Sequence, residues 1–181
     1  MIRPESDFVK SVADLANFIG VKSELNLEFS GLASDSRSVQ AGDLFVALPG
    51  STSHGASYID AVKVSGAVGV ITDEAGAKIV GAKLPVIIIS NPRHFLGAIC
   101  SWFYGSPSSA MQLVGITGTN GKTTTTSILN QILVSAGKST GLIGTVGIEI
   151  GPEKLNANFT TPEASELQSL LATMSERHIS H

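Results

Sequence analysis

The stretch that decides the fold is Gly118-Thr119-Asn120-Gly121-Lys122-Thr123-Thr124. It follows residues 113–116, an apolar run that predicts a short buried strand, and precedes residues 127–134, which predict a helix. A glycine-rich loop between a strand and a helix is typical of a nucleotide phosphate site, because its backbone N–H groups and the helix N-terminus attract anions. A glycine-rich turn without a ligand is the simpler alternative, since the strict Walker spacing would need glycine in place of Ile116.

All seven loop residues are therefore candidate ATP-binding residues. Lys122 carries the positive charge that can reach the terminal phosphates, and the Thr123 hydroxyl is a candidate Mg²⁺ ligand. These two are also the candidate catalytic residues, because phosphoryl transfer depends on neutralising charge on the phosphates.

Composition excludes several classes of protein. The chain has 181 residues, 43% of them hydrophobic, and a formal net charge of −3, which gives no sign of a nucleic-acid or membrane partner. Cys100 is the single cysteine, so no internal disulfide is possible. The sequence has neither an apolar run long enough to span a bilayer nor a signal-peptide pattern, and we expect a soluble cytoplasmic protein.

Strand and helix patterns alternate along the chain, which predicts an α/β fold with parallel strands. The breaker cluster at 105–109 predicts a boundary between a first domain at 1–109 and a second at 110–181. The expected strands of the first domain are 44–48, 67–72 and 85–89, and its expected helices are 8–19, 58–64 and 92–103.

The second domain offers only two expected strands, 113–117 and 140–145, before a last helix that starts at Pro162. A phosphate-binding sheet normally has more strands, and no acidic Mg²⁺ ligand follows on a later strand. We therefore expect an incomplete domain, with the apolar face of the last helix, Leu167 to Met174, uncovered.

Three further stretches carry a resemblance to a known family: Asp35-Ser36-Arg37, residues 42–50, and Thr160-Thr161-Pro162-Glu163. Together with the loop at 118–124 they make the chain similar to the N-terminal part of the MurE-type Mur ligases. The resemblance implies a small N-terminal α/β UDP-binding domain followed by the start of a P-loop-type, parallel-sheet ATP-binding domain. His54 stands where this family often has aspartate.

The family also implies a reaction. Its members use ATP and Mg²⁺ to join a diamino acid, lysine or a diaminopimelate-type amino acid, to UDP-N-acetylmuramoyl-L-alanyl-D-glutamate through an acyl phosphate. By resemblance, Ser34 and Ser36 contact the UDP end, and Thr160 and Thr161 contact the muramoyl-peptide end. The resemblance implies a monomer when full length, places the amino-acid-selecting domain beyond His181, and leads us to expect no amide synthesis by this chain alone.

Alternatives stay open at this stage. Asp35 and Arg37 are also consistent with a local ion pair in a turn, and Thr160 and Thr161 with capping a helix. At the level of the whole protein, the alternatives are the Mur ligase that adds the terminal dipeptide and a non-catalytic UDP-sugar-binding module.

Overall fold

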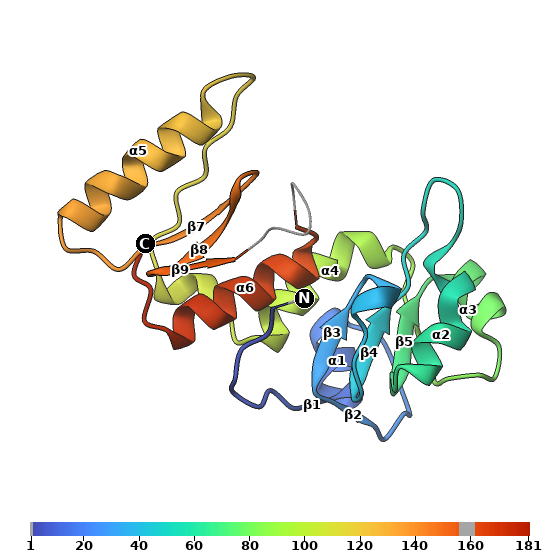
Figure 1. Cartoon of the computed structure of the whole chain (residues 1–181). Helices are drawn as coiled ribbons and strands as arrows, with labels where there is room; N and C mark the ends of the chain where they lie inside the picture. The colour runs from blue at the N-terminus through green and yellow to red at the C-terminus, as the bar shows by residue number, and fades with distance from the viewer. Residues whose placement is uncertain (1, 156–161) are drawn as a thin grey trace.

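The structure is a computed structural model, and it describes residues 2–155 and 162–181. The first half is built on a four-stranded parallel sheet (Figure 1), with strands in the order of the chain. The strands are β3 (Gly31–Ala33), β4 (Asp43–Val46), β5 (Gly69–Thr72) and β6 (Val86–Ile88). The three runs expected from the sequence thus form strands, because both faces of a parallel sheet are buried and its strands are continuously apolar.

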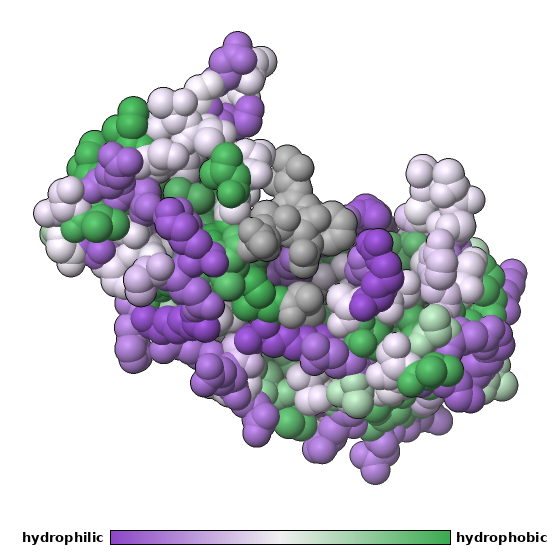
Figure 2. All heavy atoms as spheres, viewed as in Figure 1, coloured by the Kyte–Doolittle hydropathy of each residue, from purple (hydrophilic) through white to green (hydrophobic). Residues whose placement is uncertain are grey.

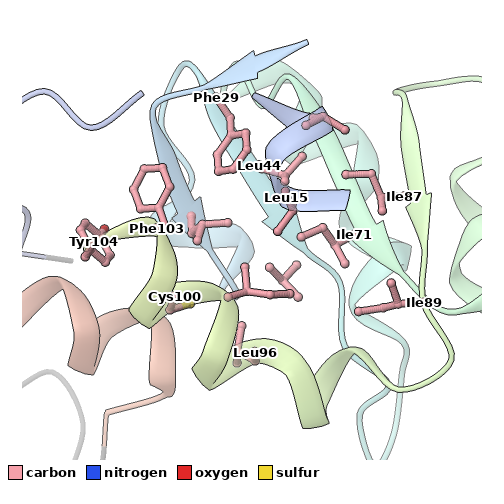
Figure 3. Packing of buried hydrophobic residues seen from close by; sticks show 14 of the residues in the cluster. Leu15, Phe29, Leu44, Ile71, Ile87, Ile89, Leu96, Cys100, Phe103 and Tyr104 are labelled. Atoms are coloured by element: carbon pink, nitrogen blue, oxygen red, sulfur yellow. The ribbon is translucent and has the colours of Figure 1, made fainter. Parts of the chain in front are cut away.

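Helices cover both faces of this sheet. Helices α1 (Val12–Ile19) and α4 (Pro92–Phe103) share one core with the sheet, and α2 (Ile59–Val64) and α3 (Glu74–Val80) share the other. Side chains alternate along β4 accordingly, since Leu44 belongs to the first core and Phe45 to the second. Figure 3 shows Leu96, Cys100 and Phe103 of α4 facing the sheet across the first core.

Capping residues set the helix starts. The Asn91 side chain accepts the His94 N–H, and Pro92 follows as the first helical residue, so α4 begins where the sequence predicts. The first helix begins later than expected, because the Ser11 hydroxyl accepts the Asp14 N–H and caps α1 at that point. Before the helix, β1 (Lys10–Ser11) pairs antiparallel with β2 (Glu28–Phe29).

Cys100 is fully buried in α4. Burial raises the pKa of the thiol to about 12, so it is protonated and unreactive at neutral pH.

The second half departs from the predicted parallel sheet. Its strands β7 (Gly141–Gly144), β8 (Gly147–Ile150) and β9 (Glu153–Leu155) form an antiparallel sheet, while residues 113–116 form no strand. Leu113 and Val114 are 56% and 62% exposed. A strand forms only beside a neighbour that completes its hydrogen bonds, and the described residues place none along this segment. The α/β class itself is confirmed.

The expectation of an uncovered last helix was wrong. Helix α6 (Ala164–Glu176) packs against α4 and the 3₁₀ helix η3 (Pro107–Ala110), and it buries Leu170, Leu171 and Met174. The exposed apolar helix is instead α5 (Lys122–Ser135), which carries the green patches at the upper left of Figure 2. Its Ile128 and Ile132 are 54% and 59% exposed.

The N-terminal segment, residues 2–6, joins α6 to the first sheet. Both Arg3 terminal nitrogens donate at 2.6 Å to the carboxylate of Asp43, which is fully buried. The Ser169 hydroxyl donates to the Ile2 carbonyl, and Glu176 accepts two backbone N–H groups of the segment. Helix α6, from the expected second domain, packs closely on α4 of the expected first domain. This packing does not separate two domains at 109, so the boundary stays a prediction.

Candidate functional site

A cleft of about 1270 Å³ lies between the carboxyl ends of the first sheet and the start of α6. Four places contribute to its walls: the turn after β3, the loop after β4, the first turn of α4 and the first turn of α6. Ligands of open parallel sheets bind at this edge, where the strand ends leave a crevice. The lining residues that carry hydroxyls or charges include Ser34, Ser36, Arg37, Tyr58, Arg93 and Ser165.

The turn after β3 presents the predicted serines. β3 ends at Ala33, and the Asp35 side chain accepts the Arg37 N–H at 2.9 Å, which starts the 3₁₀ helix η1 (Ser36–Ser38). Ser34 and Ser36 both line the cleft, and the Ser34 hydroxyl lies 2.7 Å from that of Ser165 on α6. The wall that carries the two predicted UDP contacts thus touches the wall formed by α6, the helix that follows the Thr160-Thr161-Pro162-Glu163 motif.

Asp35 and Arg37 form the local ion pair that the sequence left open, at 2.6 Å. The hydrogen bond from the Arg37 side chain, with its charge, lowers the pKa of Asp35. Asp35 and Arg37 also line the cleft wall, so their ion pair does not exclude a role in ligand binding.

Arg93 was not predicted as a site residue, and Glu163 was predicted only as the last residue of the Thr160-Thr161-Pro162-Glu163 motif. Arg93 stands in the first turn of α4 and donates to Glu163, the N-cap residue of α6, at 3.3 Å across the cleft. Both side chains are more than half exposed, so the guanidinium is accessible to an anionic ligand. The helix-start pattern Asn91-Pro92 was the signal that places Arg93 at this edge.

The candidate phosphate loop, residues 118–124, has the backbone that the sequence predicts. Gly118 and Gly121 have φ values of 146° and 79°, which favour glycine, and α5 begins directly afterwards at Lys122. Gly121 is the N-cap residue of α5 and has no side chain that could accept the first N–H groups of the helix. These donors therefore stay available to an anion. The Lys122 ammonium folds back over the loop and donates to the Gly118 carbonyl at 2.6 Å.

The loop fits phosphates better than the described residues fit a metal. The Thr123 hydroxyl lies 3.4 Å from that of Thr145 and is exposed, so it is accessible as one Mg²⁺ ligand. In residues 2–155 and 162–181, no group of three His, Cys, Asp or Glu side chains is placed to hold a metal ion.

Not all predicted residues come together. The described residues that line the cleft include Ser34 and Ser36 but no residue of the phosphate loop. The structure therefore brings the two serines together but does not place Lys122 beside them. Thr160 and Thr161 lie outside the described residues, and their predicted contact with the muramoyl peptide stays a prediction.

Two family models match the chain. The model described as "Mur ligase family, catalytic domain" matches residues 28–104, and "Mur ligase middle domain" matches residues 116–181. The chain belongs to the Mur ligase family. The first match contains the cleft residues Ser34, Ser36 and Arg93, and the second contains the phosphate loop.

Curated Mur ligases from several bacteria are similar over nearly the whole chain. The UDP-N-acetylmuramoyl-L-alanyl-D-glutamate–2,6-diaminopimelate ligase of Streptomyces coelicolor is 43% identical over 97% of this chain, and that of Streptomyces avermitilis is 42% identical over 98%. The UDP-N-acetylmuramyl-tripeptide synthetase of Leifsonia xyli is 40% identical over 98%. The chain spans about 35% of the length of each of these relatives.

Solved Mur ligase structures share the fold. A UDP-N-acetylmuramoyl-L-alanyl-D-glutamate–2,6-diaminopimelate ligase superposes with a TM-score of 0.70 at 23% identity, over 97% of this chain and 34% of that one. The MurF ligase of Thermotoga maritima, solved with ADP, gives a TM-score of 0.51 at 22% identity, over 78% of this chain and 28% of that one. No helix in the described part of this Mur ligase chain is long and apolar enough to cross a membrane.

Proposed function

We propose that this chain binds a UDP-linked muramoyl peptide and ATP, and that the whole protein adds 2,6-diaminopimelate to UDP-N-acetylmuramoyl-L-alanyl-D-glutamate in the cytoplasm. The names of the relatives, which are 43% and 42% identical, support the reaction and the amino acid. The chain covers about a third of their length, so amide synthesis is proposed for the whole protein, working as a monomer.

The cleft carries the proposal. A volume of about 1270 Å³ exceeds the usual 300–1,000 Å³ of a small-molecule pocket, which suits an extended nucleotide sugar with a peptide. Ser34 and Ser36 offer hydroxyls to the uridine end, and the half-exposed Arg93 offers its charge to the diphosphate or to a carboxylate of the peptide.

The phosphate loop would hold the second substrate. The α5 N-terminus and the Lys122 ammonium both favour anions, and Thr123 adds a hydroxyl for Mg²⁺. Bound ATP would supply the phosphoryl group that activates the D-glutamate carboxylate as an acyl phosphate. For this, Lys122 would exchange its bonds to the loop carbonyls for bonds to phosphate oxygens, which would neutralise charge where it develops.

Calorimetry on the 181-residue chain tests the proposal. We expect UDP-N-acetylmuramoyl-L-alanyl-D-glutamate to bind, and Ser36→Ala to weaken binding about two- to tenfold, the size of one lost hydrogen bond. Ser135→Ala, at the exposed end of α5, is the matched control and should bind normally. Equal affinity in the unmodified chain, Ser36→Ala and Ser135→Ala would show that Ser36 does not contact the substrate. Absence of binding by the unmodified chain would contradict the proposal.

A second titration separates the proposed ligase part from a non-catalytic UDP-sugar module. The proposed function predicts that ATP with Mg²⁺ binds to the same chain and that Lys122→Ala abolishes this binding without affecting the nucleotide sugar. A chain that binds only the nucleotide sugar would favour the module.

A further inference from the structure

A half-exposed aromatic ring stands in the wall of the cleft. Tyr58 lines the cleft and is 52% exposed. The other aromatic side chain in the described part of the wall is that of Phe45, which is buried in the second core. None of the aromatic pairs among the described residues includes Tyr58. Within the described wall, Tyr58 therefore presents the one aromatic surface that a ligand can reach.

The local fold holds the backbone of Tyr58 in place while its ring stays outside the core. Residues 49–54 form a lobe that projects above the first sheet in Figure 1 and leads into the 3₁₀ helix η2 (Gly55–Tyr58). Ala56 and Ile59, on either side of Tyr58, are 0% and 1% exposed and belong to the second core. Because these neighbours face the core, the position of Tyr58 is fixed and its ring faces outward.

Helix α2, which follows η2, turns one exposed side toward the cleft. Ala61 and Ser65 line the cleft together with Tyr58. Positions 58, 61 and 65 are three and four residues apart, so they share one side of the helix, while Val62 belongs to the second core. The side chains of Ala61 and Ser65 are small and leave room beside the larger ring.

The turn that carries the predicted uridine contacts lies next to this side of α2. The 3₁₀ helix η1 is in contact with α2, and Ser36 of η1 lines the same cleft as Tyr58. The aromatic ring and the Ser36 hydroxyl are therefore presented by neighbouring elements to one cavity.

A uracil base needs two kinds of contact. Its edge carries amide donors and acceptors, which hydroxyl groups such as that of Ser36 can satisfy. Its two faces are flat and apolar, and aromatic side chains bind such faces by stacking. The serines and charged groups of the cleft suit the edge of the base, the ribose and the phosphates, but they offer no flat surface to a face. In the described wall, Tyr58 supplies that surface.

We propose that the Tyr58 ring is the surface on which the uracil base of the nucleotide sugar stacks, an assignment that rests on the proposed function of the cleft. Stacking favours a flat aromatic base, because a saturated, puckered ring loses the close contact between faces. Tyr58 is then a specificity-determining residue, and its ring, not its hydroxyl, carries the effect.

The test combines a change in the chain with a change in the base. One ligand is UDP-N-acetylmuramoyl-L-alanyl-D-glutamate, and the other is the same molecule with a 5,6-dihydrouracil base, which keeps the amide edge but is neither aromatic nor flat. Calorimetry measures both ligands on the unmodified 181-residue chain, Tyr58→Ala, Tyr58→Phe and Val64→Ala. Val64 is 89% exposed on α2 and is not among the residues that line the cleft, so its variant is the matched control.

For the uracil ligand, we expect Tyr58→Ala to weaken binding about five- to hundredfold, the size of one lost base–aromatic stack, and Tyr58→Phe and Val64→Ala to stay within about twofold of the unmodified chain. The dihydrouracil ligand should bind the unmodified chain more weakly than the uracil ligand, and Tyr58→Ala should not weaken it further. No loss in Tyr58→Ala, an equal loss for both ligands, or a loss in Tyr58→Phe as large as in Tyr58→Ala would overturn the proposal.

A second measurement distinguishes failure of this assignment from failure of the proposed function. The chain has two tyrosines, and Tyr104 is only 5% exposed and is not among the residues that line the cleft. Labelling with 3-fluorotyrosine therefore gives one ¹⁹F NMR signal for Tyr58 and one as an internal reference. The substrate should shift the Tyr58 signal and leave that of Tyr104 in place.

The outcomes separate clearly. A substrate that binds by calorimetry without moving the Tyr58 signal would overturn the stacking assignment and leave the proposed function standing. Absence of binding by the unmodified chain would contradict the proposed function of the cleft, and the assignment of Tyr58 with it.

Discussion

The side-chain hydroxyls of Ser34 and Ser165 lie 2.7 Å apart and join the end of β3 to the first turn of α6. The two residues are 131 positions apart in the chain, and Ser165 is only 3% exposed. Their hydrogen bond therefore fixes two walls of the cleft relative to each other. We therefore expect ligand binding in the cleft to be coupled to the docking of α6 through this contact.

The Ser34–Ser165 bond predicts a coupling energy. Each alanine substitution should destabilise the chain, Ser165→Ala by about 0.5–1.5 kcal/mol, and the double variant should cost less than the sum of the two. Urea unfolding of the four chains in this mutant cycle measures the difference. Strictly additive losses would show that the two hydroxyls do not interact.

Arg3 should matter far more for stability than a charged residue at the surface. Its partner Asp43 is fully buried, so Arg3→Met leaves an uncompensated charge and should cost about 3–5 kcal/mol. Arg177→Met is the matched control, because the Arg177–Glu153 pair is 40% and 47% exposed and should cost less than about 1 kcal/mol. Equal shifts of the urea midpoint in the two variants would contradict the role given to Arg3.

Glu176 should contribute stability that depends on pH. Burial favours a higher pKa, but the hydrogen bonds from Ser6 and from the Glu5 backbone outweigh it and hold the pKa of Glu176 below its usual value. A lowered folded-state pKa stabilises the fold above the unfolded pKa of about 4.3, and this stability is lost as the pH falls through the folded value.

Glu176→Gln should accordingly unfold at lower urea than the unmodified chain at pH 7, with the gap closing at pH 3. Glu24→Gln, at an exposed position, controls for the loss of charge. A gap of the same size at pH 3 would show that packing, and not the carboxylate, is responsible.

Lys122 should matter for catalysis and not for the fold. It is exposed at the start of α5, so Lys122→Ala should leave the urea midpoint unchanged. In the whole ligase the same change should cut turnover at least about 100-fold, as expected when charge stabilisation at the phosphates is lost. Lys138→Ala, exposed just beyond the end of the same helix, should keep normal turnover. Near-normal turnover in Lys122→Ala would contradict a role for this loop in phosphate binding.

Sequence patterns predicted the first half well because its elements are decided locally. The apolar runs at 44–48, 67–72 and 85–89 overlap β4, β5 and β6, and the Asn91-Pro92 start fixes α4. The phosphate loop was also predicted, since its glycines and the following helix are adjacent in the chain.

Long-range packing explains what the sequence did not predict. An apolar run such as 113–116 has no way to specify its neighbours, and in this structure it has none among the described residues. The burial of α6 depends on α4 and on the antiparallel sheet. That sheet was missed even though Ile148 and Ile150 alternate with Glu149 ahead of a Gly151-Pro152 turn. Arg93 and Glu163 meet across 70 residues, which no local pattern reveals.

A crystal structure of the chain with UDP-N-acetylmuramoyl-L-alanyl-D-glutamate tests the central claim most directly. We predict electron density for the nucleotide sugar in the cleft between η1, the lobe at 49–54 and the start of α6, with Ser34 or Ser36 within hydrogen-bonding distance of the uridine end. Density for the ligand elsewhere on the chain, with Ser34, Ser36 and Arg93 untouched, would contradict the account.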